Sequence, residues 1–446
     1  MDRNRRNRRR KRVKINYPRL IISIGVLLLL IFLLFSGVRA VFRKVFPKKS
    51  TVTTEEQEKT DKSDTNNQPV SGGDLNQNSK IEDFDYINKL IENSHPYFEE
   101  KIHSKKIDWK KITDEYKDKI SSTETNSDFI NILSEYVNQL GDEQTHIVSY
   151  DFYNYLNEKY TAENNTQWLS ILNLDISKGR YALLAADKID NIINNQNISS
   201  GSNVSLETPI SGQLALIKVK SFDESLKSSD TKAIRDYLES ITDYKNLVID
   251  ISEVNDGVNS YWIDNLVSPL ISSEVSFAGR IAKKNDEFKS FLDYSYKNKH
   301  SYLTFGDEFP ISELPLELNV ESYVRENFKS YKRFDITVEP SSPVGYEGRI
   351  FILQGPKVYG AADTFSQFAK STGFATVIGK ATRGYGMTAE IDPVLINLPN
   401  SGLILRMPAV MGLNYDGSST AKSGTKPDIE INKEIIDIKE ITDFIN

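Results

Sequence analysis

The sequence contains no cysteine, and only four of its 446 residues are histidines. Without a thiol the chain cannot form a disulfide, so the fold must be held together by its core alone. Thiolate ligands are excluded as well, and the spacing of the histidines does not resemble that of a zinc site. We therefore expect no metal site and no cofactor. The histidines are His95, His103, His146 and His300.

Positive charge is concentrated at the N-terminus. The first 50 residues hold 15 Lys and Arg against one acidic residue, Asp2, although the whole chain has a net charge of −6. The rest of the chain is therefore acidic. An acidic main body argues against nucleic acid as its partner.

Only one long apolar run occurs, from Leu20 to Val38, and its 19 positions carry no charge. This length allows a helix to cross the ~30 Å hydrocarbon layer of a membrane. The ten Lys and Arg before the run outnumber the five that closely follow it, which predicts a cytoplasmic N-terminus. We expect a cytoplasmic basic segment (1–19), a single-pass transmembrane helix (20–42) in the cell membrane, and an extracellular body.

A cleaved signal peptide is the alternative to this anchor. Val38 and Ala40 occupy the two positions that a signal peptidase inspects, and both are small or apolar. The apolar run is longer than the usual core of a signal peptide, which favours the uncleaved anchor.

The body divides by composition into three parts. Residues 43–80 are almost free of apolar residues and predict a disordered extracellular linker. Residues 81–160 show apolar positions at helical spacing and predict a helical subdomain. Residues 161–446 alternate short apolar runs with helical patterns, which indicates an α/β domain whose sheet is covered on both faces.

Within this α/β domain, dense apolar runs at 213–222, 246–251 and 349–355 predict buried strands. Residues 285–345 fit neither pattern well and are expected to be an insertion. A terminal helix is predicted from about Lys433.

The stretch YGAAD, Tyr359 to Asp363, stands between the apolar run RIFILQGPKV and the helix-like run TFSQFAKSTG. Hydrolases often hold a nucleophile at such a strand–turn–helix junction, because the turn exposes one side chain beside unpaired helix N–H groups. The apex here is Gly360, which has no side chain. Taken alone, the stretch also fits an ordinary glycine turn.

Several fragments, in order, resemble one family. They are GQLALIKVKSF, NLVIDI, VYGAADTFSQFAKSTGFATVIGKATRGYG and MGLNYDGSSTAKSGTKPDI. Together they resemble the core of the tail-specific (C-terminal-processing, tricorn-core) serine peptidases, in the extracellular Gram-positive branch that lacks a PDZ domain. The resemblance covers roughly residues 85–432. It implies a crotonase-like (ClpP/crotonase-type) α/β sandwich core with an N-terminal helical subdomain.

The resemblance also assigns the family's nucleophilic serine to Gly360, followed by Ala361, Ala362 and Asp363. Without a hydroxyl no covalent acyl-enzyme can form. Tyr359, Gly360, Ala361 and Asp363 are then expected to line a peptide-binding cleft.

The general base of the family's Ser–His branch falls on Gln144, in LGDEQTHIV. An amide cannot take a proton from a hydroxyl near neutral pH. His146 shares a face with Gln144 in an extended segment and is one candidate substitute. Tyr385, at the lysine position of the family's other branch, is a second, although a phenol with a pKa near ~10 is a poor base. We expect Gln144 and Gly360 to lie across one cleft.

The family's oxyanion loop, Arg-x-Asn-x-Gly-Gly, falls on the segment ISEVNDG. Ser252, Glu253, Val254 and Asp256 replace most of it, and Gly257 remains. Acidic side chains beside an oxyanion hole would oppose the developing negative charge.

Three readings follow from these substitutions. The favoured one is a membrane-anchored extracellular pseudopeptidase that binds a peptide or protein terminus by adding it to a sheet edge. The alternative is an active serine endopeptidase that uses Ser366, Thr364 or Tyr359 with His146, although residues 364 and 366 fall inside the predicted helix. A wall-associated structural protein without a peptide ligand is the third.

Overall fold

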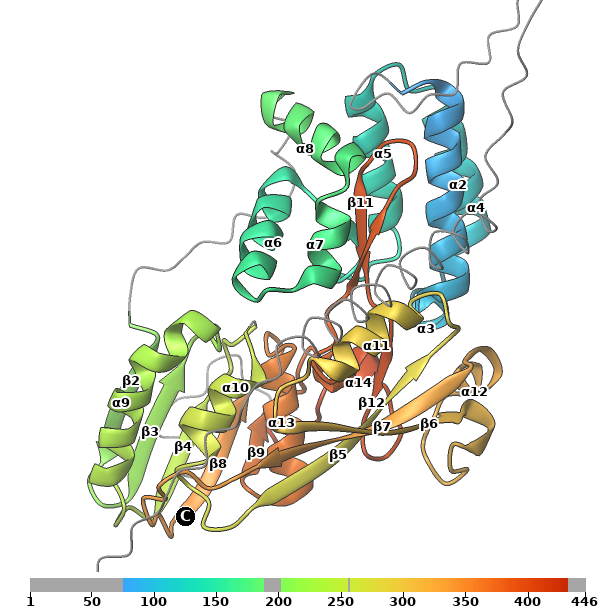
Figure 1. Ribbon diagram of the computed structural model, residues 1–446. Coiled ribbons are helices and arrows are strands. Elements are labelled where there is room, and N and C mark those ends of the chain that lie inside the picture. Colours follow the sequence, from blue (N-terminus) through green and yellow to red (C-terminus); the bar gives the residue numbers. More distant parts are fainter. Residues whose placement is uncertain (1–74, 188–201, 256, 432–446) are drawn as a thin grey trace, which may run out of the picture. The chain divides into compact units, whose positions relative to one another are not determined.

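The computed structural model describes residues 75–187, 202–255 and 257–431 (Figure 1). The predicted transmembrane helix (20–42), nearly all of the linker and the terminal helix from Lys433 lie outside these ranges. Within them, no helix combines the length and apolar character needed to cross a membrane.

Helices make up the N-terminal part of the described chain. Local signals fix their ends: Thr125 and Asp128, for example, form a reciprocal capping box at the start of α5. Trp168, Leu172 and Tyr181 are buried in the same core as the earlier helices, so the helical part continues past residue 160, where the α/β domain was expected to begin. The helices are α2 (Gln77–Ser94), α3 (Phe98–Lys105), α4 (Trp109–Ser121), α5 (Asn126–Asn138), α6 (Tyr150–Ala162), α7 (Thr166–Leu172) and α8 (Asp175–Asp187).

A six-stranded sheet forms the centre of the α/β part, in the order β13-β9-β8-β4-β3-β2. Only β2 runs antiparallel to its neighbour, and the other neighbouring pairs are parallel. The three predicted runs supply β3, β4 and β8 as expected. The strands are β2 (Val204–Ile210), β3 (Leu214–Val219), β4 (Asn246–Asp250), β8 (Arg349–Gln354), β9 (Thr376–Gly379) and β13 (Ile429–Glu430).

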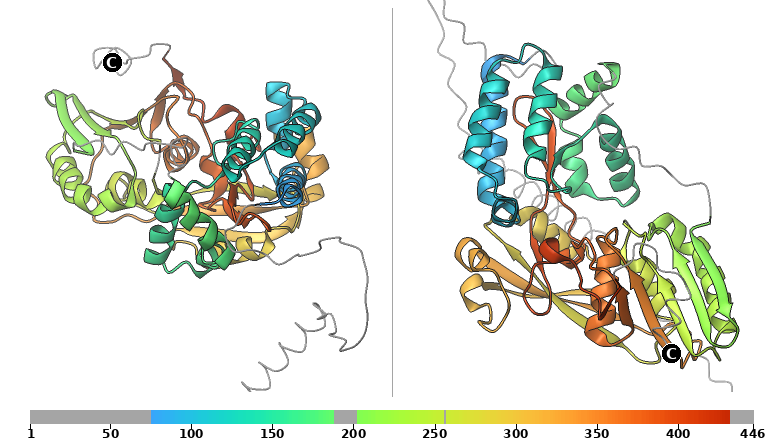
Figure 2. Two further views of the ribbon diagram at one scale, coloured as in Figure 1. Left: turned by 90° about the horizontal axis from the view of Figure 1, so that it is seen from above. Right: turned by 180° about the vertical axis from the view of Figure 1, so that it is seen from behind.

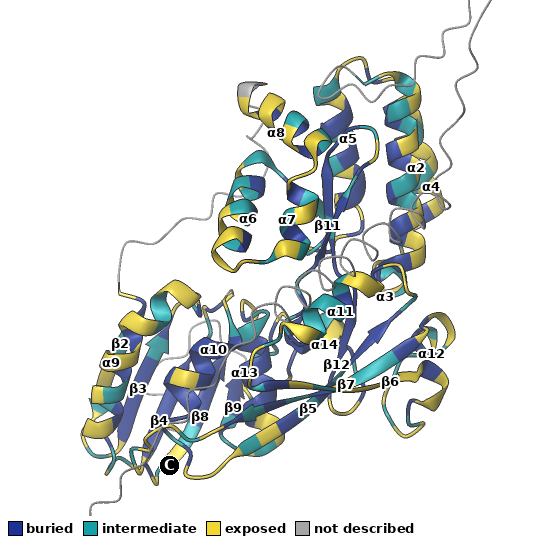
Figure 3. Cartoon of the chain, viewed as in Figure 1, coloured by how far each residue is buried: buried dark blue, intermediate teal, exposed yellow. Residues whose placement is uncertain are grey.

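The crossover helices cover one face of this sheet, and the strands beneath them are buried (Figure 3). Phe365 and Phe368 of α13 pack on Trp262, with ring centroids 5.2 and 5.1 Å apart. These contacts seat α13 against the helix that follows β4. The elements are α9 (Glu224–Ser240), α10 (Asn259–Trp262), a π-helical turn (Ile263–Val267) and α13 (Ala361–Thr372).

A second sheet is antiparallel, in the order β12-β5-β7-β6. Residues 285–345, expected to be an insertion, supply two of its strands, and β7 pairs with β5 from Ser330 to Val338. The segment thus belongs to the regular fold; the half-exposed, charged strands hid its alternation in the sequence. Its elements are β5 (Val275–Lys283), α11 (Lys289–Lys297), β6 (Leu303–Pro310), a 3-10 turn (Ile311–Glu313), α12 (Ser322–Asn327), β7 (Ser330–Val338) and β12 (Met411–Leu413).

A third, small sheet joins the helical part to the rest. It consists of β1 (His146–Ile147), β11 (Ile404–Met407) and β10 (Val394–Asn397), in that order. The β10–β11 hairpin runs among the helices in the views of Figures 1 and 2. The remaining elements are a 3-10 turn (Gly386–Thr388) and α14 (Thr420–Ser423).

Candidate functional site

The turn between β8 and α13 holds a conformation that disfavours side chains. Gly360 has φ 57° and ψ −121°, a region that glycine reaches without steric cost and other residues occupy only under strain. Its N–H donates to the Gly384 carbonyl at 3.0 Å. A Cβ placed on Gly360 would meet no heavy atom within 4 Å. The backbone of this turn is as sharp as that of a nucleophile-bearing turn, and the space that a side chain at its apex would occupy is open.

Gln144 and the turn meet in space although more than two hundred residues separate them. Burial raises the pKa of the Tyr359 hydroxyl, and the nearby Gln144 side chain lowers it in part. Tyr359 directly precedes Gly360. Gln144, Tyr359, Gly360 and Ala361 are all partly exposed. The positions that the resemblance gives to the base and the nucleophile therefore lie near one another.

Asp363, in contrast, does not face this surface. It is fully buried and accepts hydrogen bonds from the hydroxyls of Thr382 and Thr425, both at 2.5 Å, and from the Gly386 N–H at 2.9 Å. Burial raises the pKa of its carboxyl. Its role in the structure is to tie two loops to the start of α13, so it does not line a peptide site.

Behind the turn, Asp142 is the centre of a buried hydrogen-bond network. Tyr385 donates to its Oδ1 at 2.7 Å and Thr145 to its Oδ2 at 2.5 Å. His95 Nε2 lies 3.0 Å from the same Oδ2. The Tyr97 N–H donates to His95 Nδ1 at 3.1 Å, so the ring hydrogen is on Nε2, which lies 2.7 Å from Thr145 Oγ1 as well as beside the carboxylate.

The charges in this network exclude Tyr385 as a base. Burial opposes the ionisation of Asp142, but the hydrogen bonds from His95, Thr145 and Tyr385 outweigh it and lower the carboxyl pKa. Burial and the Asp142 charge raise the pKa of Tyr385 far above its usual range. The Tyr385 phenol stays protonated and donates to Asp142, so it cannot accept a proton.

His146, the other candidate base, lies on β1 opposite Arg406. Its ring centroid is 5.5 Å from that of Phe152. Burial and the nearby Arg406 charge lower its pKa to about 4. Across the described ranges of the chain no hydroxyl hydrogen-bonds His146, so it has no nucleophile to activate.

The candidate substitute nucleophiles on α13 are buried. Ser366 is fully buried, and its hydroxyl has no hydrogen-bond partner among the described residues. The Thr364 hydroxyl donates to the Gly386 carbonyl at 2.6 Å. Neither side chain can reach a substrate at the Gly360 apex.

The segment at the oxyanion-loop position forms hydrogen bonds with the end of the preceding strand, β4. The Ser252 N–H and hydroxyl both donate to Asp250 Oδ1, at 2.9 and 2.6 Å, and Val254 is fully buried. Glu253 forms an ion pair with Lys357 at 2.6 Å, so its charge is largely offset, contrary to the expected repulsion of an oxyanion. Gly257 presses against the Phe222 carbonyl, and Asp256 lies outside the described residues.

Two cations lie over the rings of Tyr359 and Tyr385. Arg383 lies 4.9 Å from the centroid of the Tyr359 ring and forms an ion pair with Glu143. Lys101 lies 5.3 Å from the centroid of the Tyr385 ring, and burial lowers its pKa. Of the site residues, His95 and these two cations were missed from the sequence, because no motif marks them.

No grouping of three or more His, Asp or Glu that could hold a metal occurs in the described part of the chain.

A sharp turn joins a parallel strand to a helix, and the buried hydrogen-bond network around Asp142 lies behind it. This arrangement is typical of hydrolase-like α/β proteins. Residues 213–431 match the model of peptidase family S41, and residues 78–138 match that of the tricorn protease C1 domain. The chain belongs to the tail-specific protease family, as the sequence predicted.

One solved structure shares the fold, and two others align less closely. A Parabacteroides merdae protein described as a peptidase aligns with a TM-score of 0.50 and 14% identity, over 82% of this chain and 92% of its own. Mature CPAF complexed with lactacystin aligns with a TM-score of 0.48 and 13% identity, over 79% and 94%. The photosystem II D1 C-terminal processing protease aligns at 0.40 and 10%, over 83% and 97%. No curated protein matches the sequence significantly.

Proposed function

We propose that this chain is a catalytically inactive, membrane-anchored and extracellular member of the tail-specific protease family that binds peptides or protein termini. The observation that carries the proposal is Gly360: the backbone of a nucleophile turn is kept, its apex is open, and no attacking atom is present. Covalent acyl transfer requires such an atom.

The neighbouring positions support the same reading. Gln144 lies near the Tyr359 hydroxyl and has no titrating proton. Tyr385 is committed as a donor to Asp142. Since each position is occupied by a group that cannot carry out the family's chemistry, the proposal does not depend on Gly360 alone.

The residues at this surface are suited to binding a peptide. Gln144, Tyr359, Gly360 and Ala361 present an amide, a ring and open backbone on one partly exposed surface. An extended peptide could dock there through main-chain hydrogen bonds. The membrane anchor and outside location rest on the apolar run and the basic segment before it.

The test uses the purified full chain in detergent. We expect no labelling by a serine-directed fluorophosphonate and no hydrolysis of unstructured casein, but saturable binding of labelled unstructured peptides by fluorescence anisotropy. Turnover that is abolished by Ser366→Ala or His146→Ala would instead establish the active endopeptidase. Absence of both turnover and peptide binding would leave only the structural role.

A further inference from the structure

The six-stranded sheet has a second apolar face, opposite α13. Along β3, β4 and β8, Ile217, Ile249 and Ile352 belong to the core that contains Phe365 of α13. Their sequence neighbours point the other way, because successive side chains in a strand alternate between the two faces. We call the following set the outer face: Leu214, Leu216, Val248, Phe351, Leu353 and Ile378.

The strand register makes the outer face one continuous patch. Leu216, Val248 and Phe351 stand side by side on β3, β4 and β8, and Leu353 stands beside Ile378 on β9. Four strands at ~4.8 Å spacing make the patch about 14 Å wide. It is far too apolar to be left in water without cost.

The outer face is in fact buried: Val248 is 0% exposed and Leu216 8%. Among the described residues, the only apolar side chains that join this cluster from outside β3, β4, β8 and β9 are Ile429 and Ile431. Both follow β9 at the far edge of the sheet, where β13 pairs with it. They cannot cover Val248, which lies two strands away from β9.

We propose that the chain's own C-terminal segment, residues 433–445, forms a helix that packs on the outer face. Four of its six apolar residues recur at spacings of three, three and four, which places these four on one stripe of a helix. Eleven residues of helix span about 16 Å, close to the width of the patch. The stripe consists of Ile435, Ile438, Ile441 and Ile445.

The place where the described chain ends supports this occupant. The Ile431 N–H donates to the Gly379 carbonyl at 2.9 Å, and Ile431 is itself only 4% exposed. The next residues therefore start at the margin of the outer face. The family S41 match also stops at residue 431, so the segment lies outside the matched region.

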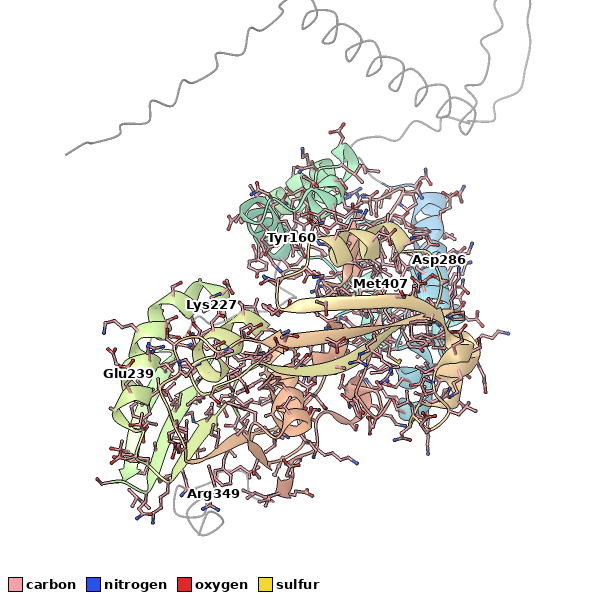
Figure 4. The ribbon with its side chains drawn as sticks, turned by 60° about the horizontal axis from the view of Figure 1, so that its bottom comes forward. Tyr160, Lys227, Glu239, Asp286, Arg349 and Met407 are labelled. Carbon is pink, nitrogen blue, oxygen red and sulfur yellow. The ribbon has the colours of Figure 1, made fainter. Side chains whose placement is uncertain are left out.

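Charge at the rim of the patch is complementary. Arg349 on β8 lies near one end of the sheet (Figure 4), 5.7 Å from the centroid of the Phe351 ring. The segment has four acidic residues against two lysines. A helix with its apolar stripe on the strands would bring acidic positions toward this guanidinium.

The absence of cysteine allows a direct test in the full chain. Leu216→Cys is introduced into the full chain and into a chain that ends at Ile431. We expect the thiol to react with Ellman's reagent at least tenfold more slowly in the full chain. Ile217→Cys, the adjacent position under α13, should be protected in both. Equal protection of Leu216→Cys in the two chains would overturn the proposal.

Three further variants keep the test decisive if the shortened chain does not fold. Ile438→Asp, on the stripe, should lower the thermal midpoint of the full chain by roughly 5 °C, whereas Ile436→Asp, off the stripe, should change it little. In the double variant Leu216→Cys with Ile438→Cys, oxidation should link the two positions within one chain. Links between chains would mean that a second copy covers the face, and would also overturn the proposal.

Discussion

At the scale of single residues, Gly360 has the backbone conformation of an active-site turn but lacks the side chain that the chemistry requires. Its φ of 57° and ψ of −121° cost glycine little, and they would strain any residue with a side chain. The fold has kept the turn although no serine is present to require it. Asp363 helps to hold the turn in place, because it ties the start of α13 to the loops that carry Thr382 and Thr425.

Restoring the hydroxyl should not restore the enzyme. Gly360→Ser and Gly360→Ala should each destabilise the full chain by about 1–2 kcal/mol, because both place a Cβ at positive φ and neither meets a clash. Urea unfolding compares the two variants. Fluorophosphonate labelling of the serine variant should stay at the level of the alanine variant, since Gln144 cannot activate the hydroxyl. Efficient labelling of Gly360→Ser alone would show that another base operates at the site.

Asp142 should make stability depend on pH. Its pKa is lower in the folded than in the unfolded chain, so the unfolded state binds more protons between the two values. The stabilisation is present above the ordinary Asp pKa of about 4 and is lost as the pH falls toward the folded value.

We therefore expect Asp142→Asn to destabilise the full chain at pH 7 by about 2–4 kcal/mol and to flatten the decline in stability between pH 5 and 3. Urea unfolding at each pH measures both effects. Asp85→Asn, at an exposed pair with Lys117, is the control and should do little. An equally steep decline in Asp142→Asn would assign the acid sensitivity to other carboxylates.

The site was predictable from sequence only where a motif marks it. Gln144 and Gly360 could be placed together through the family resemblance. The bond between Tyr385 and Asp142 could not, because 243 positions separate the partners and no sequence pattern pairs them. His95 follows a helix end without any signature, so its role depends on tertiary packing alone.

At the scale of elements, the β10–β11 hairpin anchors the helical part. Asp83 on α2 accepts hydrogen bonds from the N–H groups of Asn400 and Ser401, at 3.0 and 2.8 Å, at the hairpin tip. Asp83 is fully buried, and burial raises its pKa. A single carboxylate thus satisfies a turn that would otherwise bury unpaired donors.

Removing this carboxylate should loosen the hairpin. Asp83→Ala leaves two buried N–H groups without acceptors, at a cost of about 2–4 kcal/mol. Limited proteolysis should then cut the tip around residues 398–403 sooner than in the parent chain. Glu82→Ala is the matched control, because Glu82 reaches only the exposed amide of Asn400. Equal protection in both variants would show that packing alone holds the hairpin.

The elements differ in how far the sequence could reveal them. β3, β4 and β8 were predicted because each is a dense apolar run buried on both faces. β6 was not, because most of its residues are exposed at a sheet edge and its charged positions break the alternation. The α7 and α8 helices were assigned to the α/β part, although both pack against α6 of the helical part.

At the scale of the whole molecule, the basic first segment and the acidic remainder predict an orientation in the membrane. The Lys and Arg before the apolar run outnumber those after it, and such residues are retained on the cytoplasmic side. A body placed outside the cell by this rule would meet its peptide ligands there. The proposed binding function and the proposed location therefore depend on one another biologically but can be tested separately.

Orientation is tested on intact bacterial protoplasts that express the full chain with a tag at either end. Externally added protease should remove the C-terminal tag and leave the N-terminal tag, together with a fragment of roughly 40–80 residues, protected by the membrane. The linker at 43–80 is the expected cleavage zone, since it contains few apolar residues.

A variant with Arg8, Arg9, Arg10, Lys11 and Arg12 changed to Gln should reduce the fraction of molecules whose body lies outside, because the charge bias that orients the helix is weakened. Protection of the C-terminal tag in the parent chain would contradict the anchor orientation. Release of the intact body without protease would instead indicate cleavage after Ala40.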